Sequence, residues 1–368
     1  MGGFGNGQFS WMTDSATNSF VENGKLYIVP TLTSDLIGVD AITNGYTANL
    51  TASGTCTGTS LWNNTKCLGD ASNVGSGYQI SSDEESIVCS SVTNLAQCAA
   101  VSNLTTGAII RPIQSARLTT NLSTAGNGAL RFGRVEVSAK LPTGDWLWPA
   151  IWMLPRDNAY GAWPKSGEID IVTSKGNLPS FRSDQQANSV RSALHWGAST
   201  GAGADKYIQT SNAVQMARSW FNRGFTTFGL EWTPDRVETW RETRARGIFG
   251  ATFDQTFWRR GGYAKASNNA FVNPWAISNL TKIAPFDQEF YLILSVAAGG
   301  TDGYFADDGL KPWANSGVNP ALDFWNAREA WYPTWPTEPK ERGMAVEYIK
   351  MWRIAEKGEI PGQADCKA

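Results

Sequence analysis

The stretch from Leu141 to Asn177 reads L-P-T-G-D-W-L-W-P-A-I-W-M-L-P-R-D-N-A-Y-G-A-W-P-K-S-G-E-I-D-I-V-T-S-K-G-N. Acidic and apolar residues alternate near its end. Because alternate side chains of a β-strand point to the same face, Glu168 and Asp170 should share one face, and the intervening isoleucines the other. Two carboxylates about 7 Å apart along a strand raise each other's pKa, and a shared proton can keep one of them ready as a nucleophile.

Aromatic residues surround this acidic pair in the sequence. They include Trp148, Trp152, Tyr160 and Trp163. Flat rings stack on the apolar faces of sugars, and paired carboxylates act on glycosidic bonds, so the combination is typical of a sugar site. The alternative is an ordinary amphipathic strand whose acids face solvent, and the short E-x-D motif alone favours that alternative.

Composition predicts an all-β chain. Of 368 residues only 17% are charged, whereas 37 are glycine and 17 are tryptophan, which suits short strands joined by turns. Alternating or apolar strand patterns recur at 25–30, 132–141, 148–154, 168–174, 190–196, 225–232, 237–241, 290–297 and 344–354. Helices are expected only at 323–331 and 213–220. We therefore expect one sandwich or jelly-roll domain over residues 8–356, followed by a tail at 357–368.

Charge excludes two classes of partner. The chain has 31 basic and 33 acidic residues, and no clustered basic field that would attract nucleic acid or an anionic membrane. No apolar run approaches the ~20 residues that span a bilayer. The first residues contain no basic or apolar leader, so a secreted form would already have lost its signal peptide. A monomer is the default expectation.

Five cysteines suggest an oxidising compartment. Cys56 and Cys67 flank one short loop, and Cys89 and Cys98 flank another, which predicts two disulfides stapling loops within residues 50–107. Metal binding is the weaker alternative, because the chain has one histidine and no C-x-x-C motif. Cys366 is expected to be unpaired or to have lost its partner. The protein is therefore expected to be secreted or associated with a cell wall.

The same stretch resembles the laminarinase-like branch of the family-16 glycoside hydrolases. That branch carries W-P-A-I-W-M-L-P and then W-P-x-S-G-E-I-D-I-(M/V)-E-S-(R/K)-G-N, which this chain matches at 148–155 and, with one departure, at 163–177. The likeness spans roughly residues 20–355, and its N-terminal part looks closest to fungal secreted members. It continues at L-H-W-G (194–197), L-E-W-T (230–233), F-D-Q-E-F-Y-L-I (286–293), V-A-A-G-G-T-D-G (296–303), D-F-W (323–325) and W-Y-P-T-W (331–335).

The resemblance implies a fold and a reaction. The fold is a concanavalin A-like β-jelly roll, and the reaction is hydrolysis of β-1,3-glucan with retention of configuration. In the family motif E-x-D-x-x-E the first Glu is the nucleophile, the Asp assists it and the last Glu is the general acid/base. A β-bulge after the Asp brings the last Glu onto the same face.

One position departs from the motif. Glu168 and Asp170 occupy the nucleophile and helper positions, but Thr173 stands where the acid/base Glu belongs. A hydroxyl has far too high a pKa to protonate a leaving sugar, and loss of a general acid costs ~10²–10⁴ in rate. Candidate substitutes in the sequence are Asp145, Asp157, Asp184, Lys175 and His195.

His195 and Trp196 are further candidates for contact with the ligand. They belong to the His-Trp-Gly run that the family shares, although a lone histidine at a strand end is more often a hydrogen-bonded structural residue. No metal or other cofactor is expected. A structural calcium ion occurs in this fold, but no ligand spacing here identifies one.

Two functions remain open at this point. The first is a retaining endo-β-1,3(4)-glucanase, slowed by a natural or engineered Thr173. The second is a non-catalytic, lectin-like protein that recognises β-glucan. In both cases the partner is a β-1,3-glucan or mixed-linkage oligosaccharide. A structural wall protein is a poorer reading, because it leaves the aromatic residues around the acids without a purpose.

Overall fold

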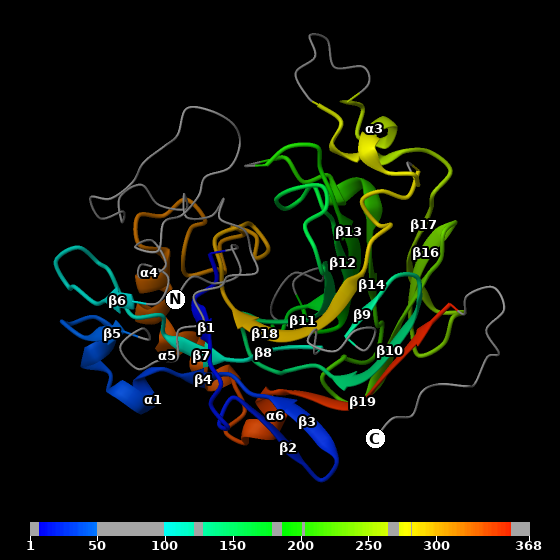
Figure 1. The fold of residues 1–368 in the computed structure, drawn as a ribbon. Helices are drawn as coiled ribbons and strands as arrows, with labels where there is room; N and C mark the ends of the chain where they lie inside the picture. The colour runs from blue at the N-terminus through cyan, green and yellow to red at the C-terminus, as the bar shows by residue number, and fades with distance from the viewer. Residues whose placement is uncertain are drawn as a thin grey trace.

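A computed structural model of the chain describes residues 7–49, 99–120, 128–178, 186–200, 203–263, 272–280 and 282–354. Cys56, Cys67, Cys89, Cys98 and Cys366 lie outside these ranges, so the predicted disulfides remain a prediction. Within them, the chain forms two large antiparallel sheets that stack face to face (Figure 1). The expected all-β jelly-roll sandwich is confirmed at this level.

The first large sheet has seven strands and forms the outer layer of the sandwich. In spatial order they are β17 (Gly247–Thr252), β16 (Arg236–Arg241), β15 (Thr226–Trp232), β10 (Gly133–Lys140), β19 (Met344–Arg353), β3 (Lys25–Ile28) and β2 (Ser19–Glu22).

The second large sheet carries the acidic pair. In spatial order its strands are β14 (Ser211–Gln215), β13 (Ser189–His195), β12 (Glu168–Ser174), β11 (Leu147–Pro155), β18 (Phe290–Ala298) and β8 (Arg117–Thr119), and β9 (Ala129–Leu130) also pairs with β18. Strand β12 therefore lies inside the sheet, between β11 and β13. An interior strand is held on both edges by backbone hydrogen bonds, which fixes its side chains in register.

Shorter elements surround the sandwich. They are the strands β1 (Ser10–Met12), β4 (Thr31–Leu32), β5 (Thr47–Asn49), β6 (Ala99–Val101) and β7 (Ile113–Ser115), the helices α1 (Ser34–Ile37), α3 (Phe257–Arg260), α4 (Pro320–Asn326), α5 (Arg328–Trp331) and α6 (Pro339–Arg342), and the 3-10 turns η1 (Asp40–Ile42), η4 (Tyr207–Thr210), η6 (Pro274–Ile277) and η7 (Tyr332–Thr334). No helix in the described part of the chain is long and apolar enough to cross a membrane.

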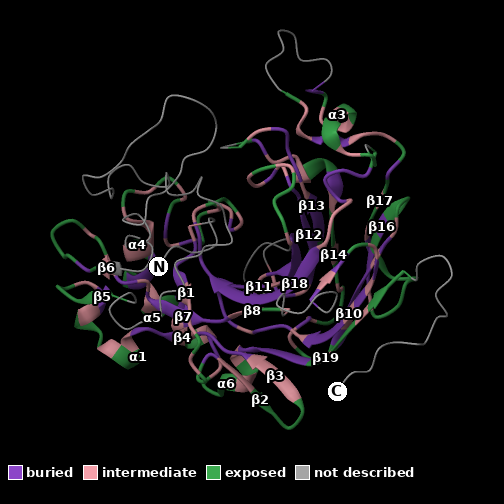
Figure 2. Cartoon of the chain, viewed as in Figure 1, coloured by how far each residue is buried: buried purple, intermediate pink, exposed green. Residues whose placement is uncertain are grey.

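The main core lies between the two sheets, where Figure 2 shows the strands as buried. Val135, Val137 and Ala139 of β10 point into it, as their alternation predicted, and meet Ile151 and Ile169 from the second sheet. Burying a large aliphatic side chain stabilises a fold by roughly 1.5–3 kcal/mol. This packing makes the second sheet a rigid support for the residues on its other face.

The helix expectations had mixed outcomes. The segment at 323–331 is helical, as α4 and α5, so that prediction is confirmed. The helix expected at 213–220 is wrong, because the chain there forms β14 and pairs with β13. Val214 packs against the core between the exposed Ala213 and Gln215, and this two-residue period matches a strand at the edge of a sheet.

Candidate functional site

Strand β12 places Glu168, Asp170 and Thr173 on one face of the second sheet, which we call the site face. Thr173 pairs with Ala150 of β11, and Asp170 pairs with Trp152. The two β12 residues are thus three positions apart in the sequence, whereas their partners on β11 are only two apart. This is the bulge that the resemblance implied, and it returns Thr173 to the face of the two acids. All three side chains are nearly buried, with 9%, 8% and 5% of their surfaces exposed.

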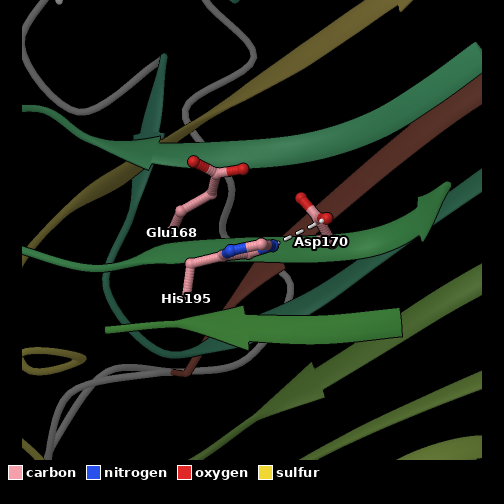
Figure 3. A group of neighbouring side chains, drawn as sticks. All are labelled: Glu168, Asp170 and His195. Atoms are coloured by element: carbon pink, nitrogen blue, oxygen red, sulfur yellow. Dashed lines mark hydrogen bonds and ion pairs between the residues drawn. The ribbon is translucent and has the colours of Figure 1, made fainter. Parts of the chain in front are cut away.

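Glu168 and Asp170 belong to a tightly connected polar cluster (Figure 3). Trp163 donates its indole N–H to Glu168 Oε2 at 2.8 Å, and the charge of Asp170 acts on the neighbouring Glu168 carboxyl. On the neighbouring strand, His195 Nε2 lies 3.2 Å from Asp170 Oδ2, and its Nδ1 lies 2.6 Å from Asp205 Oδ2. One imidazole therefore bridges two carboxylates.

Burial and like charge set the protonation of this cluster. Burial raises the pKa of Glu168 to about 8; the charge of His195 opposes this increase, and Asp170 and Asp205 add to it. Burial disfavours the charged form of His195, but the neighbouring carboxylates outweigh it and hold its pKa well above the ordinary value. At neutral pH Glu168 therefore carries a proton, and His195 is an imidazolium.

Asp205 is a site residue that the sequence did not reveal. It lies in the loop after β13, where its carboxylate also accepts hydrogen bonds from the backbone N–H groups of Trp196 and Tyr207, at 3.2 and 3.0 Å. The Tyr207 ring stacks on His195 with a centroid distance of 4.9 Å. No periodic or motif signal marks a lone Asp ten residues beyond a strand, so only the tertiary structure brings it to the site.

The surroundings of Thr173 contain hydroxyls rather than a carboxylate. The Tyr304 hydroxyl lies beside the Thr173 side chain and donates to the backbone carbonyl of Ser174 at 2.8 Å. Burial raises the pKa of Tyr304 far above its ordinary value, so this phenol stays neutral and is a very weak acid. Among the residues that the structure describes, no carboxylate forms a hydrogen bond with Thr173.

The candidate substitutes for the missing acid do not meet Thr173. The carboxylate of Asp145 accepts the backbone N–H of Leu178 at 3.1 Å, beyond the end of β12, and burial raises its pKa to about 6. Asp157 is exposed in the loop after β11, and Asp184 lies outside the described residues. Lys175 places its Nζ 4.6 Å from the centre of the Tyr304 ring, but an ammonium group cannot take over the role of a carboxylic acid.

Three of the predicted aromatic residues lie at the site face. Trp163 binds Glu168, as described, and Trp152 donates to Ser295 Oγ at 3.2 Å while the Arg117 guanidinium lies over its ring. Trp148 stacks on Tyr304 with a centroid distance of 3.8 Å and an interplanar angle of 6°. Because Tyr304 covers one face of it, Trp148 is only 8% exposed.

Two predicted aromatics lie elsewhere. Trp196 follows His195 on the chain, so it points to the opposite face of the sheet, where it is fully buried against Phe257 and Trp275. Its expected contact with ligand is corrected to a role in the core. The hydroxyl of Tyr160 donates to the carboxylate of Asp287 at 2.8 Å, which ties this ring to the loop before β18.

Glu168, Asp170 and His195 also place one ligand atom each within 4.8 Å of the others. A divalent cation could bridge such a set, but both nitrogens of His195 already face carboxylates, and an imidazolium cannot coordinate a metal. The donor set therefore fits a proton-sharing network better than a metal centre. The absence of a metal cofactor remains a prediction.

Comparison with known proteins gives the family. No family model matches the chain. The β-1,3-glucan-binding protein of Penaeus monodon is 35% identical over 365 residues, which cover 96% of this chain and 85% of that protein. The chain belongs to the β-1,3-glucan-binding protein family. A glucan endo-1,3-beta-glucosidase A1 of Niallia circulans is also similar, with 31% identity over 49% of this chain and 22% of that protein.

Other members of the family are longer. The chain spans about half (49%) of the β-1,3-glucan-binding protein 1 of Galleria mellonella, with 28% identity. Among solved structures, the laminarinase of Rhodothermus marinus aligns with a TM-score of 0.49 and 20% identity over 96% of this chain and 87% of that chain. These relatives come from arthropods and bacteria, so the expected fungal origin is not supported by them.

Proposed function

We propose that this chain binds β-1,3-glucan on the site face and hydrolyses it poorly, because its retaining nucleophile is present and its proton donor is missing. The observation that carries the proposal is the bulge of β12, which presents Thr173 beside Glu168 and Asp170. The names of the relatives, both glucan-binding proteins and glucan endo-1,3-beta-glucosidases, support the class of ligand.

Glu168 is the proposed nucleophile. A retaining mechanism needs one carboxylate to attack the anomeric carbon and a second group to protonate the leaving oxygen. Glu168 attacks in its ionised form, whose population grows as the pH approaches its pKa of about 8, while the Trp163 N–H holds one carboxylate oxygen in place. The His195 imidazolium keeps Asp170 oriented.

The leaving oxygen has no proton donor in the first, glycosylation half of the reaction. Thr173 and Tyr304 offer hydroxyls whose pKa values are far too high to protonate a departing sugar alkoxide near neutral pH. The substrate would therefore bind without being cleaved at an appreciable rate. Loss of a positioned general acid slows turnover by ~10²–10⁴, which turns a hydrolase into a slow enzyme with a long-lived complex.

A second candidate is a purely recognising protein. The name of the Penaeus monodon relative and the hydroxyl-rich surroundings of Thr173 favour it. The two candidates differ in the reactivity of Glu168, because only a protein of catalytic descent keeps a functional nucleophile. We further propose that the protein is secreted, acts as a monomer and needs no metal, so that EDTA leaves glucan binding unchanged.

The test combines binding with covalent trapping. Laminarin binding is measured by calorimetry, and the chain is incubated with a dinitrophenyl β-glucan oligosaccharide, whose leaving group needs no proton. We expect laminarin binding together with a glycosyl adduct on Glu168, found by mass spectrometry, which forms faster as the pH rises toward the pKa of Glu168 at about 8.

The control is Glu168→Gln, which should bind laminarin and form no adduct. Binding without any adduct in the unmodified protein would favour the purely recognising candidate. A chain that binds no laminarin would refute both candidates.

A further inference from the structure

Arg191 is a cation on the site face to which the proposed reaction assigns no role. It lies on β13, directly across from Thr173 on β12, and its side chain is exposed. Its other neighbour across the sheet is Ala213 of β14. Both flanking residues are uncharged, and Arg191 forms no hydrogen bond or ion pair with any residue that the structure describes.

Arginines on the outer sheet of the same protein are arranged differently. Arg236 pairs with Glu231 at 3.2 Å and with Glu238 at 3.1 Å, and Arg246 pairs with Glu242. A guanidinium with no acidic partner keeps its five donors available in a planar fork, which suits carboxylate, sulfate or phosphate oxygens. Within the described part of the chain, Arg191 therefore lacks the acidic partners that Arg236 has.

Neighbouring groups strengthen this cationic character. The charge of Arg191 acts on the Tyr304 hydroxyl, and Lys175 lies over the ring of the same tyrosine. The hydroxyls of Tyr304 and Thr173 stay neutral and can donate or accept hydrogen bonds. Titratable groups that face this region are Tyr304, Lys175, Asp170 and, on the loop that carries Tyr304, the exposed Asp302.

The site face is therefore polarised along β12. Its Glu168 end mixes charges, because Asp170 and Asp205 contact the His195 imidazolium and Arg117 lies over Trp152, whereas its Thr173 end combines the cations Arg191 and Lys175 with neutral hydroxyls. The two ends lie about four strand steps, or ~13 Å, apart. An anion would meet carboxylates at the first end and the Arg191 guanidinium at the second, so the second end is the more favourable place for a charged ligand group.

We propose that the Thr173 end of the site face binds an anionic substituent carried by the glucan, such as a sulfate, phosphate or carboxylate group, with Arg191 as the main contact. This inference rests on the proposed function, because the glucan brings the substituent to the site face. Arg191 is then a specificity-determining residue that distinguishes substituted from neutral glucan.

The experiment compares the binding of laminarin and of lightly sulfated and carboxymethylated laminarin, by calorimetry at low and high salt. A charge-assisted bidentate contact contributes roughly 1.5–3 kcal/mol, so we expect at least about tenfold tighter binding of the anionic forms at low salt. The preference should shrink at high salt. Using both substituents distinguishes a general anion site from one selective for a single group.

Arg191→Gln should abolish the preference and leave the affinity for neutral laminarin within about twofold, since it removes only the charge-assisted contact. Arg191→Lys should keep part of the preference, because an ammonium retains the charge but loses the fork. The matched control is Arg236→Gln on the outer sheet, which should keep the full preference.

Equal affinity for neutral and anionic glucan, or a preference that survives Arg191→Gln, would overturn the inference. Failure to bind neutral laminarin together with Arg191-dependent binding of the anionic forms would refute the proposed function and uphold the inference. Binding of no form would refute both.

Discussion

Glu168 is a carboxyl group that the fold keeps protonated at neutral pH. Its surface is 9% exposed, and burial raises its pKa from 4.5 to about 8. In the unfolded chain the group ionises near its ordinary pKa. Folding therefore costs more free energy as the pH rises between these values, because the native state must hold a proton that the unfolded state has released.

Conformational stability should accordingly fall as the pH rises from about 5 to 9. Glu168 and His195 both have raised pKa values in the folded protein, so both contributions are complete at low pH and are lost as the pH rises through those values. Glu168→Gln mimics the neutral carboxyl group and should remove its part of the slope.

The measurement is the midpoint of thermal unfolding across that pH range for both proteins. Glu168→Gln should be the more stable of the two at pH 9, and the two curves should converge near pH 5. If Glu168→Gln instead unfolds at a lower temperature than the unmodified protein, and the difference is larger at pH 9 than at pH 5, the carboxyl group is not held neutral.

Strand β12 shows how one bulge determines which residues meet. Without it Val172 would share the face of Asp170, but the extra residue returns Thr173 to that face and leaves Val172 in the core. Arg191 on β13 pairs with Thr173 across the sheet. A cation beside a carboxyl group lowers the pKa of that carboxyl group. A carboxylic acid restored at position 173 would therefore have a lowered pKa and would lose its proton at a lower pH.

Thr173→Glu alone and Thr173→Glu with Arg191→Gln should differ in their pH profiles. The general acid must be protonated to act, so the single variant should lose activity at a lower pH than the double variant, whose new carboxyl group has no cation beside it. The check is the rate of laminarin hydrolysis from pH 4 to 9. Coincident profiles would show that Arg191 does not influence this position.

The strands of the sandwich were predictable from the sequence because each carries an alternating or apolar pattern, as Val135 and Val137 do on β10. The acidic face of β12 was predictable for the same reason, and the bulge from the family resemblance. Asp205 and Tyr304 were not, because both come from loops whose course depends on tertiary packing. The edge strand β14 was wrongly predicted as a helix, because five residues are too few to distinguish the two-residue period of a strand from the period of a helix.

Across the protein as a whole, aromatic rings serve the core more than the site. Trp196 packs against Phe257 and Trp275, and Trp232 lies edge-on to Phe290 between the sheets. Aromatic side chains therefore pack against the core side of the second sheet, and other aromatic side chains lie on its site face. The number of tryptophans, 17, therefore does not indicate the number of sugar contacts, because several of these side chains are wholly buried.

Trp196→Ala should destabilise the protein by roughly 3–5 kcal/mol, the usual cost of removing a fully buried aromatic ring. Trp352→Ala, whose ring is 44% exposed on the outer sheet, is the matched control and should cost under ~1 kcal/mol. Chemical denaturation gives both values. A loss of glucan affinity in a still stably folded Trp196→Ala would reinstate Trp196 as a ligand contact.

The central claim is that a single missing carboxyl group separates this chain from an efficient β-1,3-glucanase. The decisive measurement is the rate of laminarin hydrolysis from pH 5 to 8, the range in which a restored acid can be protonated while Glu168 increasingly ionises, for the unmodified chain and for Thr173→Glu. We expect little turnover by the unmodified chain and a gain of ~10²–10⁴ in the variant. Rapid hydrolysis by the unmodified chain, or no gain in a folded variant that still binds laminarin, would contradict the central claim.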